Sequence, residues 1–212
     1  VGLWPASRRL PRRALGAIVG ASLVLMALPG ATSPAWHLGL AFQYPSGLLL
    51  GLAVVALLRR WQGGSADRAP LLAVRAAALI ALVGAVLYLD AFGLLSRGYY
   101  YAGFGPNAAP LVAVLLAAAC AFAIIRGRAR EQSAALLGAC ALFSLARLPS
   151  GNLWDAVLDP LLWAWALGTL LLAALRRLRR ARRSLPQAEA PVGAPEPALQ
   201  ALGAEPYSPT KE

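Results

Sequence analysis

The chain alternates between long apolar stretches and short polar breaks. Each apolar stretch is close to the roughly 20 residues that a helix needs to cross a bilayer. The breaks are rich in Pro, Gly, Ser and Asn, which favour turns and loops. The pattern predicts six transmembrane helices, at residues 14–31, 36–58, 71–95, 108–125, 132–148 and 160–175.

Composition supports a membrane protein. Hydrophobic residues make up 59% of the 212 residues and charged residues only 14%, with a mean hydropathy of +0.61. A soluble domain usually has about 25% charged residues. Residues 14–58 contain no Lys, Arg, Asp or Glu at all, which leaves room for two consecutive spans. We therefore expect an all-α fold, a polytopic membrane helix bundle.

The arginines predict the direction of the helices. Nineteen of the twenty basic residues are Arg, and they cluster beside the apolar stretches. If the N-terminus is cytoplasmic, seventeen arginines lie on the inner side, and only Arg97 and Arg147 lie outside. Basic residues concentrate on the cytoplasmic side of membrane proteins. The asymmetry predicts six spans with both termini in the cytoplasm.

The same pattern divides the chain into four parts. We expect a basic cytoplasmic N-terminus at residues 1–13, a transmembrane domain at 14–175 and a basic juxtamembrane segment at 176–183. Residues 184–212 contain six prolines and little that could form a core, so we expect a disordered, Pro-rich cytoplasmic tail.

Two features bear on the first helix. The N-terminal region has the layout of a secretory signal peptide, with Arg12 and Arg13, an apolar stretch and then small residues around 31–35. Cleavage there would leave five spans. Gly16 and Gly20, however, form a GxxxG step that suits helix packing. We favour an uncleaved helix on this ground. The same step recurs later in the sequence, at positions 47 and 51.

The net charge of +11 does not indicate nucleic-acid binding. Recognition of nucleic acid needs a soluble basic face, whereas here the charges flank apolar stretches. The expected partners are the lipid bilayer, anionic lipid headgroups at the basic inner face, and other membrane proteins.

No metal or cofactor is expected. The two cysteines, Cys120 and Cys140, lie in different apolar stretches without a metal-binding spacing, and we interpret both as small buried residues. The single histidine, His37, cannot pair with a second one around a haem. No lysine lies in a predicted span, which excludes a retinal-type Schiff base.

Polar residues gather at the predicted outer face. Ionisable groups in membrane spans are costly and are functional candidates by default. Asp90 lies inside an apolar stretch, and we expect it to pair with an outer arginine. Asp159 directly precedes Pro160, which is also the pattern of a helix N-cap. The candidate outer-face site comprises Asp90, Arg97, Arg147, Asp155 and Asp159.

One short segment has a family resemblance. Residues 151–155, with the sequence GNLWD, resemble the GN-x-x-D element of lipoprotein signal peptidases, which use two aspartates near the outer membrane face. Ala156 stands where that family has an arginine, and the family's other motifs are not evident in the chain.

Three function classes remain open. The favoured one is a non-catalytic subunit or scaffold of an envelope-related complex, because catalytic signatures such as a P-loop, HExxH or GxSxG are absent from the sequence. The alternatives are a transporter of a small solute or ion, and an outer-face enzyme acting on a lipid-linked substrate. The high Arg and Ala content indicates a GC-rich bacterial genome and hence the cytoplasmic membrane.

Overall fold

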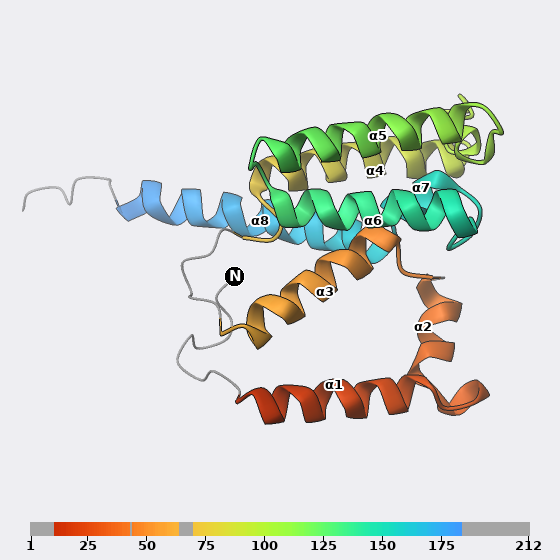
Figure 1. Cartoon of the computed structure of the whole chain (residues 1–212). Coiled ribbons are helices and arrows are strands. Elements are labelled where there is room, and N and C mark those ends of the chain that lie inside the picture. The colour runs from red at the N-terminus through yellow and green to blue at the C-terminus, as the bar shows by residue number, and fades with distance from the viewer. Residues whose placement is uncertain (1–10, 43, 64–69, 184–212) are drawn as a thin grey trace, which may run out of the picture. The chain divides into compact units, whose positions relative to one another are not determined.

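The computed structural model describes residues 11–42, 44–63 and 70–183 of the chain. Every element in these ranges is helical, which confirms the all-α prediction (Figure 1). The predicted tail at 184–212 and most of the N-terminal segment 1–13 lie outside the described residues. The elements are α1 (Arg12–Met26), η1 (Gly30–Thr32), α2 (Pro34–Phe42), α3 (Gly47–Trp61), α4 (Val74–Ala91), η2 (Tyr101–Phe104), α5 (Ala108–Ile125), α6 (Arg130–Ala146), α7 (Leu153–Val157) and α8 (Pro160–Arg183).

The chain divides into two compact units, Val1–Ala174 and Leu175–Glu212. The first unit holds α1 to α7 and the first part of α8. The described part of the second unit is the end of α8, where the helix continues through the arginines at 176–183.

In the described part of the chain, three helices are long and apolar enough to cross a membrane, namely Val74–Ala91, Ala108–Ile125 and Pro160–Ala181. Large apolar side chains on them are exposed, among them Leu82 on α4 and Leu115 on α5. An apolar surface of this extent favours contact with lipid rather than water. The other predicted spans correspond to shorter helices. α1 and α3 have 15 residues each, α6 has 17 and α2 has 9.

The second predicted span is interrupted. The prediction of one continuous helix over residues 36–58 is wrong, because α2 ends at Phe42 and α3 begins at Gly47. Pro45 lacks a backbone N–H and disfavours helical geometry in the residue before it. Ser46 then caps α3, its hydroxyl accepting a hydrogen bond from the Leu49 amide at 3.1 Å.

Close packing of α3 on α6 contributes to an apolar core cluster that also includes Leu87 of α4 and Leu162 of α8. Gly47 and Gly51 of the GxxxG step face Ala139 and Ala135 of α6. A Cβ atom at Gly51 would lie 2.8 Å from the Ala135 Cβ and 3.0 Å from its Cα. The absence of both side chains therefore lets the two backbones approach. The step at 16 and 20 does not pack in this way, because a Cβ at position 20 would have no neighbour within 4 Å.

Gly51→Ala is expected to destabilise the fold by about 1–3 kcal/mol, because the added methyl group meets the α6 backbone rather than a movable side chain. Gly138→Ala is a matched control, since a Cβ there has open space and alanine favours a helix. Thermal unfolding in detergent measures both. A Gly51→Ala variant as stable as Gly138→Ala would refute close α3–α6 packing.

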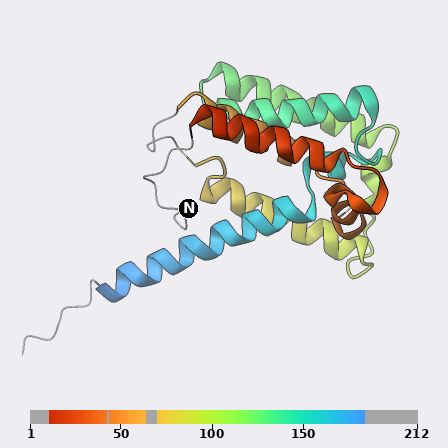
Figure 2. The ribbon, with the colours of Figure 1, turned by 90° about the horizontal axis from the view of Figure 1, so that it is seen from below.

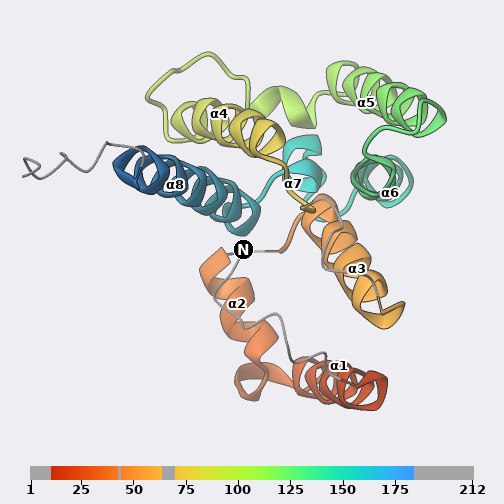
Figure 3. The same cartoon turned by 90° about the vertical axis from the view of Figure 1, so that its left-hand side faces the viewer.

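Two connecting segments of the first unit lie at the same end of the helices that they join. Figure 1 shows the connections 92–107 and 147–152 at the same end of α4, α5 and α6. Figures 1 and 2 show α5 and α6 side by side, and Figure 3 shows α4, α5 and α6 nearly end-on. At the opposite end of α3 and α6, Arg59 forms an ion pair with Glu131. The candidate site residues lie at the loop-rich end.

Candidate functional site

Asp90 organises the loop that follows α4. Its carboxylate is 3% exposed and accepts three backbone hydrogen bonds. Oδ1 accepts from the amides of Arg97 at 2.7 Å and Gly98 at 3.0 Å, and Oδ2 accepts from the amide of Tyr100 at 2.9 Å. Hydrogen bonds to a carboxylate are roughly twice as strong as those between neutral groups. The aspartate thus folds residues 97–100 back onto the helix end.

The predicted pairing of Asp90 with an arginine side chain is wrong. Within the described residues no ion pair forms at Asp90, and Arg97 contributes its backbone N–H rather than its guanidinium. The physical reason is that consecutive amides of the loop already satisfy the carboxylate. A sequence pattern marks the buried charge but not the backbone donors that reach it.

Arg97 and Arg147, which the sequence predicted on the outer side, are both exposed. Arg147 ends α6 in a left-handed conformation, with φ 53°, and its guanidinium lies over the Phe143 ring at 5.0 Å from the centroid. Neither Arg97 nor Arg147 lines the cavity described below. The structure brings the three carboxylates, Asp90, Asp155 and Asp159, to one end of the helices. Among the described residues, neither arginine forms an ion pair with them.

Asp159 is the N-cap of α8, as its position before Pro160 predicted. Its Oδ1 accepts a hydrogen bond from the Leu162 amide at 2.8 Å. Its Oδ2 accepts another from the Ser46 amide at 2.7 Å, just before α3. The carboxylate is 4% exposed and joins two helix N-termini, where the helix dipoles favour negative charge. This contact also fixes the break between α2 and α3.

Asp155 lies in α7 and connects two loops. Its carboxylate accepts hydrogen bonds from the Tyr100 hydroxyl, at 3.0 and 3.2 Å to its two oxygens, and from the Ser150 hydroxyl. Burial, followed by the charge of Asp155, raises the pKa of Tyr100 to about 12. The phenol therefore keeps its proton near neutral pH and remains a donor.

Asn152 is a second connection that the sequence analysis did not include in the site. Its side chain is fully buried, with Nδ2 donating to the Tyr100 carbonyl at 3.2 Å and Oδ1 accepting from the Trp154 amide at 2.9 Å. Gly103 packs directly against it, and a Cβ there would overlap Asn152 Oδ1. The only available signal was the position of Asn152 before a helix, where asparagine favours the N-cap.

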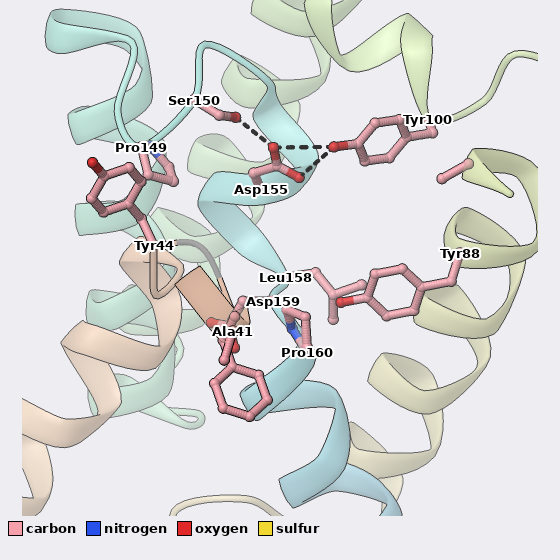
Figure 4. Close-up of a pocket in the computed structure, with 12 residues that line it drawn as sticks. Ala41, Tyr44, Tyr88, Tyr100, Pro149, Ser150, Asp155, Leu158, Asp159 and Pro160 are labelled. Atoms are coloured by element: carbon pink, nitrogen blue, oxygen red, sulfur yellow. Dashed lines mark hydrogen bonds between the residues drawn. The ribbon is translucent and has the colours of Figure 1, made fainter. Parts of the chain in front are cut away.

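A cavity of about 270 Å³ opens beside these groups (Figure 4). Asp155 and Asp159 line it, whereas Asp90 stabilises the adjoining loop. Its lining residues come from α2, α4, α7, the start of α8 and the loops between them. They are Ala41, Phe42, Tyr44, Tyr88, Ala91, Tyr100, Pro149, Ser150, Asp155, Leu158, Asp159 and Pro160.

The described residues that line the cavity supply carboxylates and hydroxyls and include no basic side chain. His37 lies elsewhere, with Nε2 2.9 Å from the Ala31 carbonyl oxygen. Among the described residues no three His, Cys, Asp or Glu side chains are grouped to hold a metal ion. Cys120 and Cys140 are buried free thiols, as predicted. The arrangement is suited to accepting hydrogen bonds and positive charge rather than to holding a phosphate.

No family model matches the chain, and no match is found among curated proteins or solved structures.

Proposed function

We propose that the chain is a non-catalytic subunit or scaffold of an envelope-related complex in the bacterial cytoplasmic membrane. The observation that supports this most is how the carboxylates are used. Asp90 and Asp159 accept backbone N–H groups that hold a loop and two helix starts, and Asp155 accepts hydroxyls from two loops. These bonds build the polar end of the helices and do not arrange reacting groups.

The proposed topology has six spans, with α2 and α3 together forming the second. Both termini are cytoplasmic in this proposal, because all arginines except Arg97 and Arg147 then face the cytoplasm. A helix of 15 residues rises only about 22 Å, less than a hydrocarbon core of about 30 Å. Local thinning of the bilayer and the long arginine side chains accommodate such short helices.

Reporter fusions test this topology. Alkaline phosphatase fused after Asn107 is expected to be highly active, because that loop faces the oxidising outer side. Fusion after Gly127 is expected to give low activity, because the arginines at 126, 128 and 130 hold that loop inside. Expression of each fusion is measured by immunoblot as the control. The reverse activities would contradict the orientation.

Crosslinking in intact cells tests the subunit role. The tagged full chain is expected to form discrete adducts well above its own 22.1 kDa. Recovery of the chain only as a monomer, under conditions that crosslink a known membrane complex, would contradict the proposal.

A transporter of a small solute or ion is a second candidate, favoured by the break in the second span. Interrupted helices beside a cavity are typical of transport sites. Here the break between α2 and α3 supplies Phe42 and Tyr44 to the cavity wall. Solute or ion flux through proteoliposomes of the purified chain would favour this candidate. An outer-face enzyme acting on a lipid-linked phosphate has less support, because both arginines lie outside the cavity.

A further inference from the structure

Among the described residues, no basic side chain balances the charge of the cavity. Asp155 and Asp159 both line it, and the part of the chain that the structure describes forms no ion pair with either. Asp159 is stabilised by two helix N-termini. The donors to Asp155 among the described residues are the neutral hydroxyls of Tyr100 and Ser150. A partly buried carboxylate without a cation attracts one.

The cavity walls suit an organic cation. The lining contains four aromatic side chains beside the two carboxylates, namely Phe42, Tyr44, Tyr88 and Tyr100. Aromatic rings attract ammonium groups through their negative faces, and clusters of rings recognise quaternary ammonium. A hydrated metal ion, by contrast, favours a shell of oxygen ligands rather than rings. The wall chemistry therefore indicates an alkylammonium group.

Tyr88 adds an unused polar group. Its hydroxyl oxygen is buried and has no hydrogen-bond partner among the described residues, although its ring packs edge-on against Trp163 with centroids 5.3 Å apart. Figure 4 shows the side chain reaching from α4 toward Leu158, across from the hydrogen-bonded group of Tyr100, Ser150 and Asp155. A phenolic oxygen can accept a hydrogen bond from an ammonium N–H. A bound amine would satisfy this group.

An apolar groove adjoins the cavity. It has a volume of about 490 Å³ and is lined by Tyr44, Pro45, Gly47, Leu50, Leu142, Leu148 and Pro149. Tyr44 and Pro149 belong to both linings, so the two spaces share a wall. A polar pocket next to an apolar groove fits a molecule with an ammonium head and a hydrocarbon chain.

We propose that the cavity lined by Asp155, Tyr88 and Tyr100 binds an ammonium group, and that the adjoining groove takes the hydrocarbon chain of the same molecule. A phospholipid with an ethanolamine headgroup has both parts, and only its ammonium group would enter the carboxylate-lined cavity. A free amine has the ammonium group without the hydrocarbon chain. The inference rests on the cavity and is independent of the subunit role proposed above.

The test compares lipids and free amines on the purified full chain. Native mass spectrometry measures retention of phosphatidylethanolamine against phosphatidylglycerol of the same acyl chains. Retention of the ethanolamine lipid is expected to exceed that of the glycerol lipid by about tenfold, given one charge-assisted contact and the aromatic walls. Thermal protection by ethanolamine or tetramethylammonium alone would instead identify a soluble amine as the source.

Two variants locate the binding. Asp155→Asn is expected to abolish the preference for the amine. Tyr88→Phe is expected to weaken binding several-fold without lowering the melting temperature, because its hydroxyl has no partner to lose. Tyr101→Phe is the matched control, since that side chain is 63% exposed and does not line the cavity. If Asp155→Asn does not fold, the test is the retention of the ethanolamine lipid by Tyr88→Phe compared with that by Tyr101→Phe. Equal retention of both lipids with no protection by free amines, or unchanged binding in Asp155→Asn and Tyr88→Phe, would overturn the proposal.

Discussion

Asp90→Ala is expected to reduce the yield of folded protein several-fold, the largest effect among the single substitutions considered. The buried carboxylate accepts the amides of Arg97, Gly98 and Tyr100. Alanine leaves these donors without their partner, and the loop 92–100 loses its attachment to α4. Tyr100 would also move, and with it the hydroxyl that contacts Asp155. Size-exclusion chromatography of detergent extracts measures the folded yield.

Asp67→Ala is the control for the change of charge, because it also replaces one aspartate by alanine. Its yield is expected to equal that of the parent chain. Asp90→Asn is expected to be intermediate, since the amide keeps one acceptor oxygen but points an NH₂ group at the remaining donors. Equal, parent-like yields from Asp90→Ala and Asp67→Ala would contradict the loop-anchoring role.

Gly103→Ala is expected to destabilise the fold by about 3 kcal/mol. A Cβ at this position overlaps Asn152 Oδ1 and the ring of Trp154. Asn152 is fully buried and uses its amide to bond the Tyr100 carbonyl and the Trp154 amide, so it cannot move aside without breaking both bonds. Loss of a buried hydrogen-bond network adds to the cost of overpacking. Thermal unfolding in detergent measures the change.

The control for Gly103→Ala is again Gly138→Ala, which has open space around the added methyl group. It is expected to leave the melting temperature unchanged or to raise it slightly. The double variant Gly103→Ala, Asn152→Ala separates the two causes. If Asn152 is the obstacle, the double variant loses less stability than the sum of the two single losses. Strict additivity would show that Gly103 and Asn152 do not interact.

Most helices could be predicted from the sequence, because apolar length and loop residues are local signals. The span at 108–125 coincides with α5, and the span at 71–95 contains α4. The span at 36–58 could not be drawn correctly from hydropathy alone, because Ala41 to Gly47 carry no charge. Pro45 and Ser46 indicate locally that a helix could begin there. The contact that fixes the break joins Ser46 to Asp159, 113 positions later in the chain, and no local pattern shows it.

The candidate site could be predicted only where the signal was local. Asp159 has Pro160 beside it, so its N-cap role was visible in the sequence. The partners of Asp90 are backbone amides, which every residue carries and no pattern marks. Tyr88 and Asn152 matter because the fold buries them, and burial depends on the packing of distant segments. Arg97 and Arg147 lie near the carboxylates in sequence, but their side chains are exposed.

One comparison tests most directly what holds the polar end of the helices together. It measures the melting temperature of the Arg97→Gln, Arg147→Gln double variant and that of Asp90→Asn. If hydrogen bonds from backbone amides to the carboxylates hold this end together, the arginine variant melts close to the parent chain. Replacing Arg147 removes only its surface contact with the Phe143 ring. Asp90→Asn then melts several degrees lower. An arginine variant that loses as much stability as Asp90→Asn would show that ion pairs, and not backbone anchors, organise this end of the protein.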